Sequence, residues 1–148
     1  MRFSKQIATI AIAVAATWTL SSATTSFAAE RSLYERLGGV GAIQAVVTKF
    51  IGNVGGDKRI NGYFATTDLK QLNKHLVNQV CMATGGPCSY EGRDMKTTHK
   101  GMKVTTAAFN ALVEDLVKAL DTFNVPKQEK DELLAILGPM KKDIVEVP

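Results

Sequence analysis

Two histidines and two cysteines are the side chains of this sequence best suited to bind a metal. His75 and His99 lie on different segments with helical patterning, and Cys81 and Cys88 stand seven positions apart. The sequence has no Ser/His/Asp spacing, no glycine-rich phosphate loop and no group of carboxylates near a histidine. Nucleophilic and acid–base catalysis need such groups. Metal ligation is therefore the chemistry that the residues favour.

Three interpretations of the histidines stay open on this evidence. In the first, both are ordinary histidines at a helix surface or satisfied in the core. In the second, the two histidines and two cysteines hold a structural zinc ion, although their spacing matches no common zinc pattern. In the third, one histidine is presented to haem in an apolar slot between helices. The sequence lacks Cys-x-x-Cys-His, which argues against covalent c-type attachment.

The surroundings of His99 distinguish it from an ordinary core histidine. It lies on a short segment between Gly92 and Gly101, with Met95 one turn before it and Met102 just after it. A helix interrupted on both sides buries little apolar surface. We therefore expect this segment to present the His99 side chain rather than to build core.

The elements that must position these residues are predicted to be helices, because apolar residues recur at three- and four-residue steps and no stretch alternates long enough for a strand. The expected boundaries, in chain order, are Ser32 to Gly38–Gly39, a second helix closing at Gly55–Gly56, a third from Thr67 or Asp68 to Gly85–Pro87, a fourth capped by Thr105 or Thr106, and a last from Val125–Pro126 that Pro139 interrupts. Their expected inward residues are Ile43, Val46, Val47, Phe50, Ile51 and Val54; Leu69, Leu72, Leu76, Val80 and Ala83; Phe109, Leu112, Val113, Leu116, Leu120 and Phe123; and Leu133, Ile136, Leu137, Met140 and Ile144.

The first 28 residues are predicted to be a cleaved secretory signal. Arg2 and Lys5 precede a short apolar run, and Ser26 and Ala28 supply small residues where a signal peptidase would cut after position 28. An uncleaved amphipathic anchor is the alternative. The mature protein, 29–148, is expected to be a single periplasmic or secreted domain with no membrane span.

Removing the signal takes two of the 18 basic residues and none of the 14 acidic ones, so the formal charge falls from +4 to +2. This balance, without a basic tract, argues against a nucleic-acid partner. In an exported protein Cys81 and Cys88 either form a disulfide or stay as two buried thiols. A bridge closing so small a loop would contribute roughly 2.5 kcal/mol.

An ordered set of short motifs resembles the group I truncated haemoglobins. The set comprises Tyr34–Gly39, Phe50, Tyr63–Phe64, Gly85–Pro87, Tyr90–Gly92 and Met95–His99, and the resemblance extends from about Ser32 to Ile144. It implies a fold in which two helices pack over two around non-covalent haem b, with a shortened proximal helix. It also implies that His99 is the proximal iron ligand, that Phe64 packs on the haem face, and that Met95, Val104 and Phe109 are further haem contacts.

The distal side departs from the family pattern. The family usually places a tyrosine after the phenylalanine that matches Phe50, often supported by glutamine on the third helix, but this sequence has Ile51, Leu72 and Leu76 there. None of the three donates a hydrogen bond to bound dioxygen. His75 matches a position from which some cyanobacterial members bind the iron, so we expect it to be a distal ligand. If it points to solvent or to a propionate instead, the iron is five-coordinate.

The resemblance leaves two functions open. The first is reversible binding of O2, CO or NO as a haemoglobin. The second is a bis-histidine haem protein that transfers electrons, or an enzyme of peroxide or nitrogen-oxide chemistry, served by an unidentified reductase. Candidates to pair with the haem propionates are Lys70, Lys74, Lys96 and Lys100.

Overall fold

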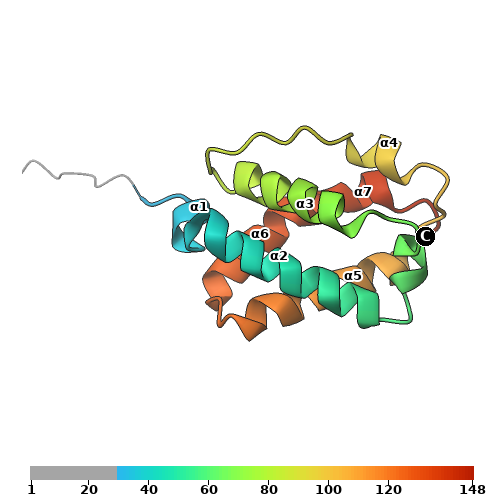
Figure 1. Cartoon of the computed structure of the whole chain (residues 1–148), viewed down its shortest axis with the longest axis horizontal. Helices are drawn as coiled ribbons and strands as arrows, with labels where there is room; N and C mark the ends of the chain where they lie inside the picture. The colour runs from blue at the N-terminus through green and yellow to red at the C-terminus, as the bar shows by residue number, and fades with distance from the viewer. Residues whose placement is uncertain (1–29) are drawn as a thin grey trace, which may run out of the picture.

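The computed structural model describes residues 30–148, and the predicted signal segment lies outside them. The described chain is helical, without a strand, as the sequence predicts (Figure 1). One isolated bridge joins Thr105 to Val147. No helix in this part of the chain is long and apolar enough to cross a membrane. The elements are α1 (Leu33–Arg36), α2 (Gly39–Gly56), η1 (Asn61–Phe64), α3 (Leu69–Ala83), α4 (Met95–His99), α5 (Thr106–Thr122), α6 (Lys127–Leu137), η2 (Gly138–Met140) and α7 (Lys141–Ile144), where η denotes a 3-10 helix.

Side-chain caps fix where the helices begin. Ser32 starts α1 with the predicted capping box, since its hydroxyl accepts from the Glu35 backbone and the Glu35 carboxylate accepts from the Ser32 backbone. Asp68 caps α3 by accepting from the N–H groups of residues 70 and 71, both at 3.0 Å. Thr105 caps α5 through the Ala108 N–H at 3.0 Å. These contacts decide between the alternative caps that the sequence left open.

Glycine and proline set the main breaks. Gly38 and Gly39 have φ angles of 98° and 77°, a left-handed turn that lets α2 start directly after α1. Pro139 lies in η2, so the last helical segment is divided into α6 and α7 as predicted.

The most extensive packing between helices is that of α2 with α3 and of α2 with α5, so α2 lies between them (Figure 1). Ile43 and Val47 of α2 pack with Val77 and Cys81 of α3. Phe50 of α2 packs in a second cluster that includes residues of α5. These clusters hold the helices that form the walls of the site.

Three predicted inward residues are exposed. Leu69, in the first turn of α3, is 48% exposed but still lines the cavity described below, whereas the expectation was wrong for the other two. Phe123 is 46% exposed because it is the C-cap of α5, where the chain leaves the helix. Ile136 is 36% exposed, whereas Leu133 is the buried residue of α6.

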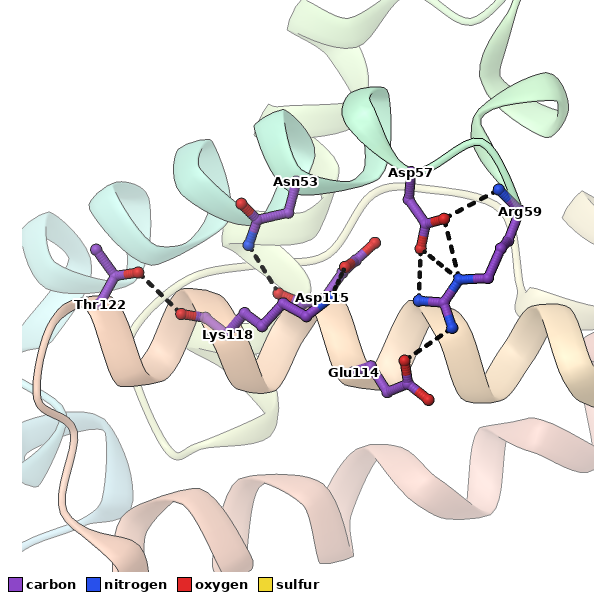
Figure 2. A network of polar contacts seen from close by, with 7 residues as sticks. All are labelled: Asn53, Asp57, Arg59, Glu114, Asp115, Lys118 and Thr122. Atoms are coloured by element: carbon purple, nitrogen blue, oxygen red, sulfur yellow. Dashed lines mark hydrogen bonds and ion pairs between the residues drawn. The ribbon is translucent and has the colours of Figure 1, made fainter.

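A polar network ties the end of α2 to α5 (Figure 2). Asn53 Nδ2 donates to the Asp115 carbonyl at 3.0 Å. Arg59 bonds Asp57 on one side at 2.7 Å and Glu114 of α5 on the other at 2.9 Å. Hydrogen bonds from the Arg59 side chain and backbone lower the pKa of Asp57 to about 2. These contacts hold the segment between α2 and η1 against α5.

Candidate functional site

A cavity of about 600 Å³ lies among α2, α3, α4, α5 and the α6–η2 segment. Its walls are almost wholly apolar: only Asn61, Gln79 and His99 bring polar side chains to it. The volume is within the range of cofactor and ligand pockets, roughly 300–1,000 Å³. An apolar cavity with a few polar groups suits a flat apolar cofactor better than a free ion.

His99 ends α4 and is oriented by a hydrogen bond. Its Nδ1 lies 2.7 Å from the Met95 carbonyl oxygen, one turn earlier. Because a carbonyl only accepts, Nδ1 carries the proton and donates, which leaves the lone pair on Nε2 free. His99 also lines the cavity. This arrangement presents an imidazole whose Nε2 is available to bind a metal.

The short helix α4 is stabilised by its N-cap rather than by burial. Asp94 accepts from the Thr97 N–H at 2.8 Å and from the Thr97 hydroxyl at 2.7 Å. These two bonds lower the pKa of Asp94. The helix begins after Asp94, so the cap, not Gly92 alone, sets its start. The sequence shows this signal as an Asp three residues before a Thr, but the predictions overlooked it.

The turn after His99 is held by the C-terminal end of the chain. Glu146 accepts from the Gly101 N–H at 2.7 Å and from the Lys103 N–H at 2.6 Å, and both bonds lower its pKa. Val104 in turn accepts from the backbones of residues 146 and 147. Gly101 and Lys103 have φ angles of 82° and 55°, so the turn is a tight left-handed one. No sequence pattern pointed to Glu146, because its partners lie more than forty residues away.

Most of the predicted site residues meet at this cavity. Val104 lies beside it, lining a neighbouring cavity of about 60 Å³ that also includes His99. The four candidate propionate lysines are exposed. The predicted site residues that line the main cavity are Phe50, Ile51, Phe64, Leu72, Leu76, Met95, His99 and Phe109.

His75, the predicted distal ligand, does not line the main cavity. Its ring lies against that of Tyr90, with the centroids 6.0 Å apart and the planes at 71°. The neighbouring Leu76 does line the cavity. His75 thus stands beside the distal wall with its ring engaged elsewhere.

Gln79 is a site residue that the sequence analysis missed. It lies one turn after His75, and its amide contacts the sulfur atoms of Met140 at 3.4 Å and Met95 at 3.8 Å. It continues the helical spacing of Leu72 and Leu76, which is the signal that could have found it.

Cys81 and Cys88 are joined by a disulfide, with their Cα atoms 5.7 Å apart. Cys81 is fully buried at the end of α3, and Cys88 lies in the segment that follows. Because the two sulfurs are bonded to each other, they cannot serve as thiolate ligands of zinc. Within residues 30–148, no group of three or more His, Cys, Asp or Glu residues is arranged to hold a metal ion.

A five-residue helix that presents one imidazole to an apolar cavity between longer helices is the arrangement expected of a globin haem site. The chain belongs to the bacterial-like globin family, whose model matches residues 32–146. The donor and the apolar walls fit the haem that this family implies. The fold is that of the truncated 2/2 globins, as expected from the sequence.

Individual relatives agree. The chain is 31% identical to a group 1 truncated hemoglobin of Tetrahymena pyriformis over 78% of this chain and 95% of that protein. It is 33% identical to one of Synechocystis, over 77% and 97%. The crystal structure of the Tetrahymena pyriformis protein in its Fe(III) form matches with a TM-score of 0.75 over 78% of this chain and 98% of that one. A Synechococcus 2/2 hemoglobin with covalently attached heme matches with a TM-score of 0.73, 34% identity and the same coverage.

Proposed function

We propose that this chain is a haem b protein that reversibly binds dioxygen or another diatomic gas, with His99 as the proximal ligand. The observation that carries the proposal is the Nδ1 hydrogen bond to the Met95 carbonyl, which leaves Nε2 free at an apolar cavity. When bound, haem would supply an iron able to bind a diatomic gas. The chain would supply the His99 nitrogen to that iron and a cavity with apolar walls to the porphyrin.

We propose non-covalent attachment. Both cysteine sulfurs are already bonded to each other, so no thiol remains to form a thioether with a haem vinyl group. His75 and His99 are the only imidazoles in the sequence, and in this proposal His99 binds the iron while the His75 ring packs on Tyr90. In the Synechococcus relative the heme is attached covalently. Extraction into acidified butanone distinguishes the two cases here, because non-covalent haem leaves the protein and attached haem stays.

The side chains at the expected distal positions influence which gas is held. Ile51, Leu72 and Leu76 line the cavity and cannot donate a hydrogen bond. The two amides at the cavity stand at other positions, Asn61 in η1 and Gln79 against the sulfur atoms of Met95 and Met140. A donor to a partly charged acceptor contributes about 1.5 kcal/mol or more. We therefore expect dioxygen to dissociate about tenfold faster than from a pocket with one such donor, whereas CO, a weaker acceptor, should be held almost equally well.

The alternative function is a six-coordinate redox protein with His75 on the iron and a reductase as its electron partner. What favours gas binding is the position of His75, whose ring packs on Tyr90 and does not line the cavity. Ligation by His75 requires that contact to break.

We also propose that the protein acts outside the cytoplasm, in the periplasm or secreted. The N-terminal pattern supports export, and a disulfide is typical of an oxidising compartment. The mass of the protein recovered from cell fractions tests this: loss of residues 1–28 from the exported form supports it, and an intact N-terminus in the cytoplasm contradicts it.

Absorption spectra of the purified protein with hemin test the haem site. We expect a nitrogen-ligated Soret band in the wild type and its loss in His99→Ala. Added imidazole should restore the band in that variant by filling the space of the missing ring. Phe123→Leu, at an exposed position outside the cavity, is the control and should match the wild type. An undiminished nitrogen-ligated band in His99→Ala would show that His99 is not the ligand.

A further inference from the structure

The segment between α3 and α4 runs back alongside α3 before α4 begins (Figure 1). The disulfide attaches it to the end of α3, and the Gly86 N–H donates to the Cys81 carbonyl at 2.8 Å within the same turn. Tyr90 follows Cys88 by two residues. The segment is therefore attached at one end by a covalent bond, close to Tyr90.

Tyr90 itself is held in one position within this segment. Its hydroxyl donates to the Arg93 carbonyl at 2.8 Å. Its ring covers Gly92 so closely that a Cβ there would overlap Tyr90 Oη and Cζ and lie 2.7 Å from Cε2. Partial burial raises the pKa of Tyr90, so the phenol stays protonated and able to donate. The hydrogen bond and the glycine together fix where the ring edge points.

That ring meets His75. The 71° angle between the planes and the 6.0 Å between centroids form an edge-to-face pair. His75 adjoins Leu76, whose side chain lines the cavity, so the His75 ring stands next to the cavity wall without lining it. The pair with Tyr90 favours the location outside the cavity.

We propose that Tyr90 is a positioning residue that holds the His75 imidazole outside the haem cavity and so keeps the distal coordination position open for an external ligand. The proposal rests on the haem function proposed above. An edge-to-face aromatic pair shifts such an equilibrium roughly 2- to 12-fold. Loss of the Tyr90 ring should raise the ratio of His75-ligated to five-coordinate haem by that factor.

The test uses hemin-reconstituted protein and its visible spectrum in both oxidation states. Tyr90→Ala should increase the low-spin, six-coordinate fraction, and adding His75→Leu to it should abolish that increase. Tyr90→Phe keeps the ring but loses its hydrogen bond to Arg93, and its low-spin fraction should lie between those of the wild type and Tyr90→Ala. Gly92→Ala displaces the ring without removing it, and should behave like Tyr90→Ala. Glu91→Ala, an exposed change in the same segment, is the control.

A second measurement needs no haem. In apoprotein NMR spectra, the His75 ring protons should carry a ring-current shift that disappears in Tyr90→Ala and persists in Tyr90→Phe. Far-UV circular dichroism confirms that each variant is folded.

The outcomes separate the two proposals. If wild type and variants alike fail to give a nitrogen-ligated Soret band, the haem function fails. If the wild type binds hemin but is already fully ligated by His75, haem binding stands and the positioning role is wrong. The positioning role is also wrong if the low-spin fraction of Tyr90→Ala equals that of the wild type.

Discussion

Adding a hydrogen-bond donor to the distal wall should selectively slow the loss of dioxygen. Leu76 lies on the cavity wall and is partly buried, and it adjoins His75 on α3. Glutamine extends one atom further than leucine, and its terminal amide can reach into the cavity. One hydrogen bond to the partly negative end of bound dioxygen contributes about 1.5 kcal/mol. We therefore predict that Leu76→Gln slows dioxygen dissociation about tenfold.

The assay is stopped-flow displacement of dioxygen by CO, with CO dissociation measured separately by displacement with NO. CO is the poorer acceptor, so its dissociation rate should change less than twofold. Leu76→Met is the matched control, because it keeps the side-chain volume and adds no donor. If Leu76→Gln and Leu76→Met have equal ratios of dioxygen to CO dissociation rates, the inference that a donor at position 76 reaches the bound ligand is refuted.

Three further predictions concern the framework. Replacing both cysteines, Cys81→Ala/Cys88→Ala, should lower the free energy of unfolding by about 2.5 kcal/mol from the loop term alone, measured by urea denaturation; an unchanged midpoint would contradict it. Gly86→Ala should cost about 1–3 kcal/mol in the same assay, because its Cβ would lie 2.5 Å from a Tyr34 ring carbon and 2.6 Å from Cys81 Sγ. Glu146→Gln should lower Tm most near neutral pH. The folded pKa of Glu146 is lowered, so its carboxylate stabilises the protein above the ordinary glutamate pKa, and that contribution is lost as pH falls through the lowered value. A Tm difference that persists unchanged at pH 3 would show that the charge is not responsible.

The local signals in the sequence were sufficient to predict the helices and most of the residues that line the cavity. Ser32 and Asp68 cap their helices through bonds to residues two or three positions away, so the pattern that predicts them contains both partners. Leu72 and Leu76 were expected on one face of their helix from both the helical spacing and the family resemblance, and both line the cavity. Leu69 and Phe123 share the spacing of their helices but stand at helix ends, where spacing no longer determines burial.

The contacts that the sequence could not reveal are those between distant segments. Glu146 holds the turn after His99, yet nothing near position 146 indicates this. The orientation of His75 depends on Tyr90, whose position depends in turn on Gly92 and the disulfide. The side of α3 that carries His75 is readable from the sequence, but its choice of rotamer is not.

The proposed proximal and distal sides of the haem site are therefore held by separate parts of the chain. His99 is oriented by Met95 and by the turn that Glu146 holds, whereas the ring of His75 is held by Tyr90 from the segment between α3 and α4. Contacts with no shared partner make additive contributions.

In Glu146→Gln, we expect faster transfer of hemin to apomyoglobin with an unchanged low-spin fraction. Tyr90→Ala should change the low-spin fraction. When His75→Leu is also present, so that His75 cannot bind the iron, Tyr90→Ala should leave the rate of hemin loss unaltered. In the same His75→Leu background, the Glu146→Gln/Tyr90→Ala double variant should lose hemin at the rate of Glu146→Gln alone. A double variant that departs from that rate by more than about twofold would show that the two sides are coupled, and the separation argued from these contacts would be wrong.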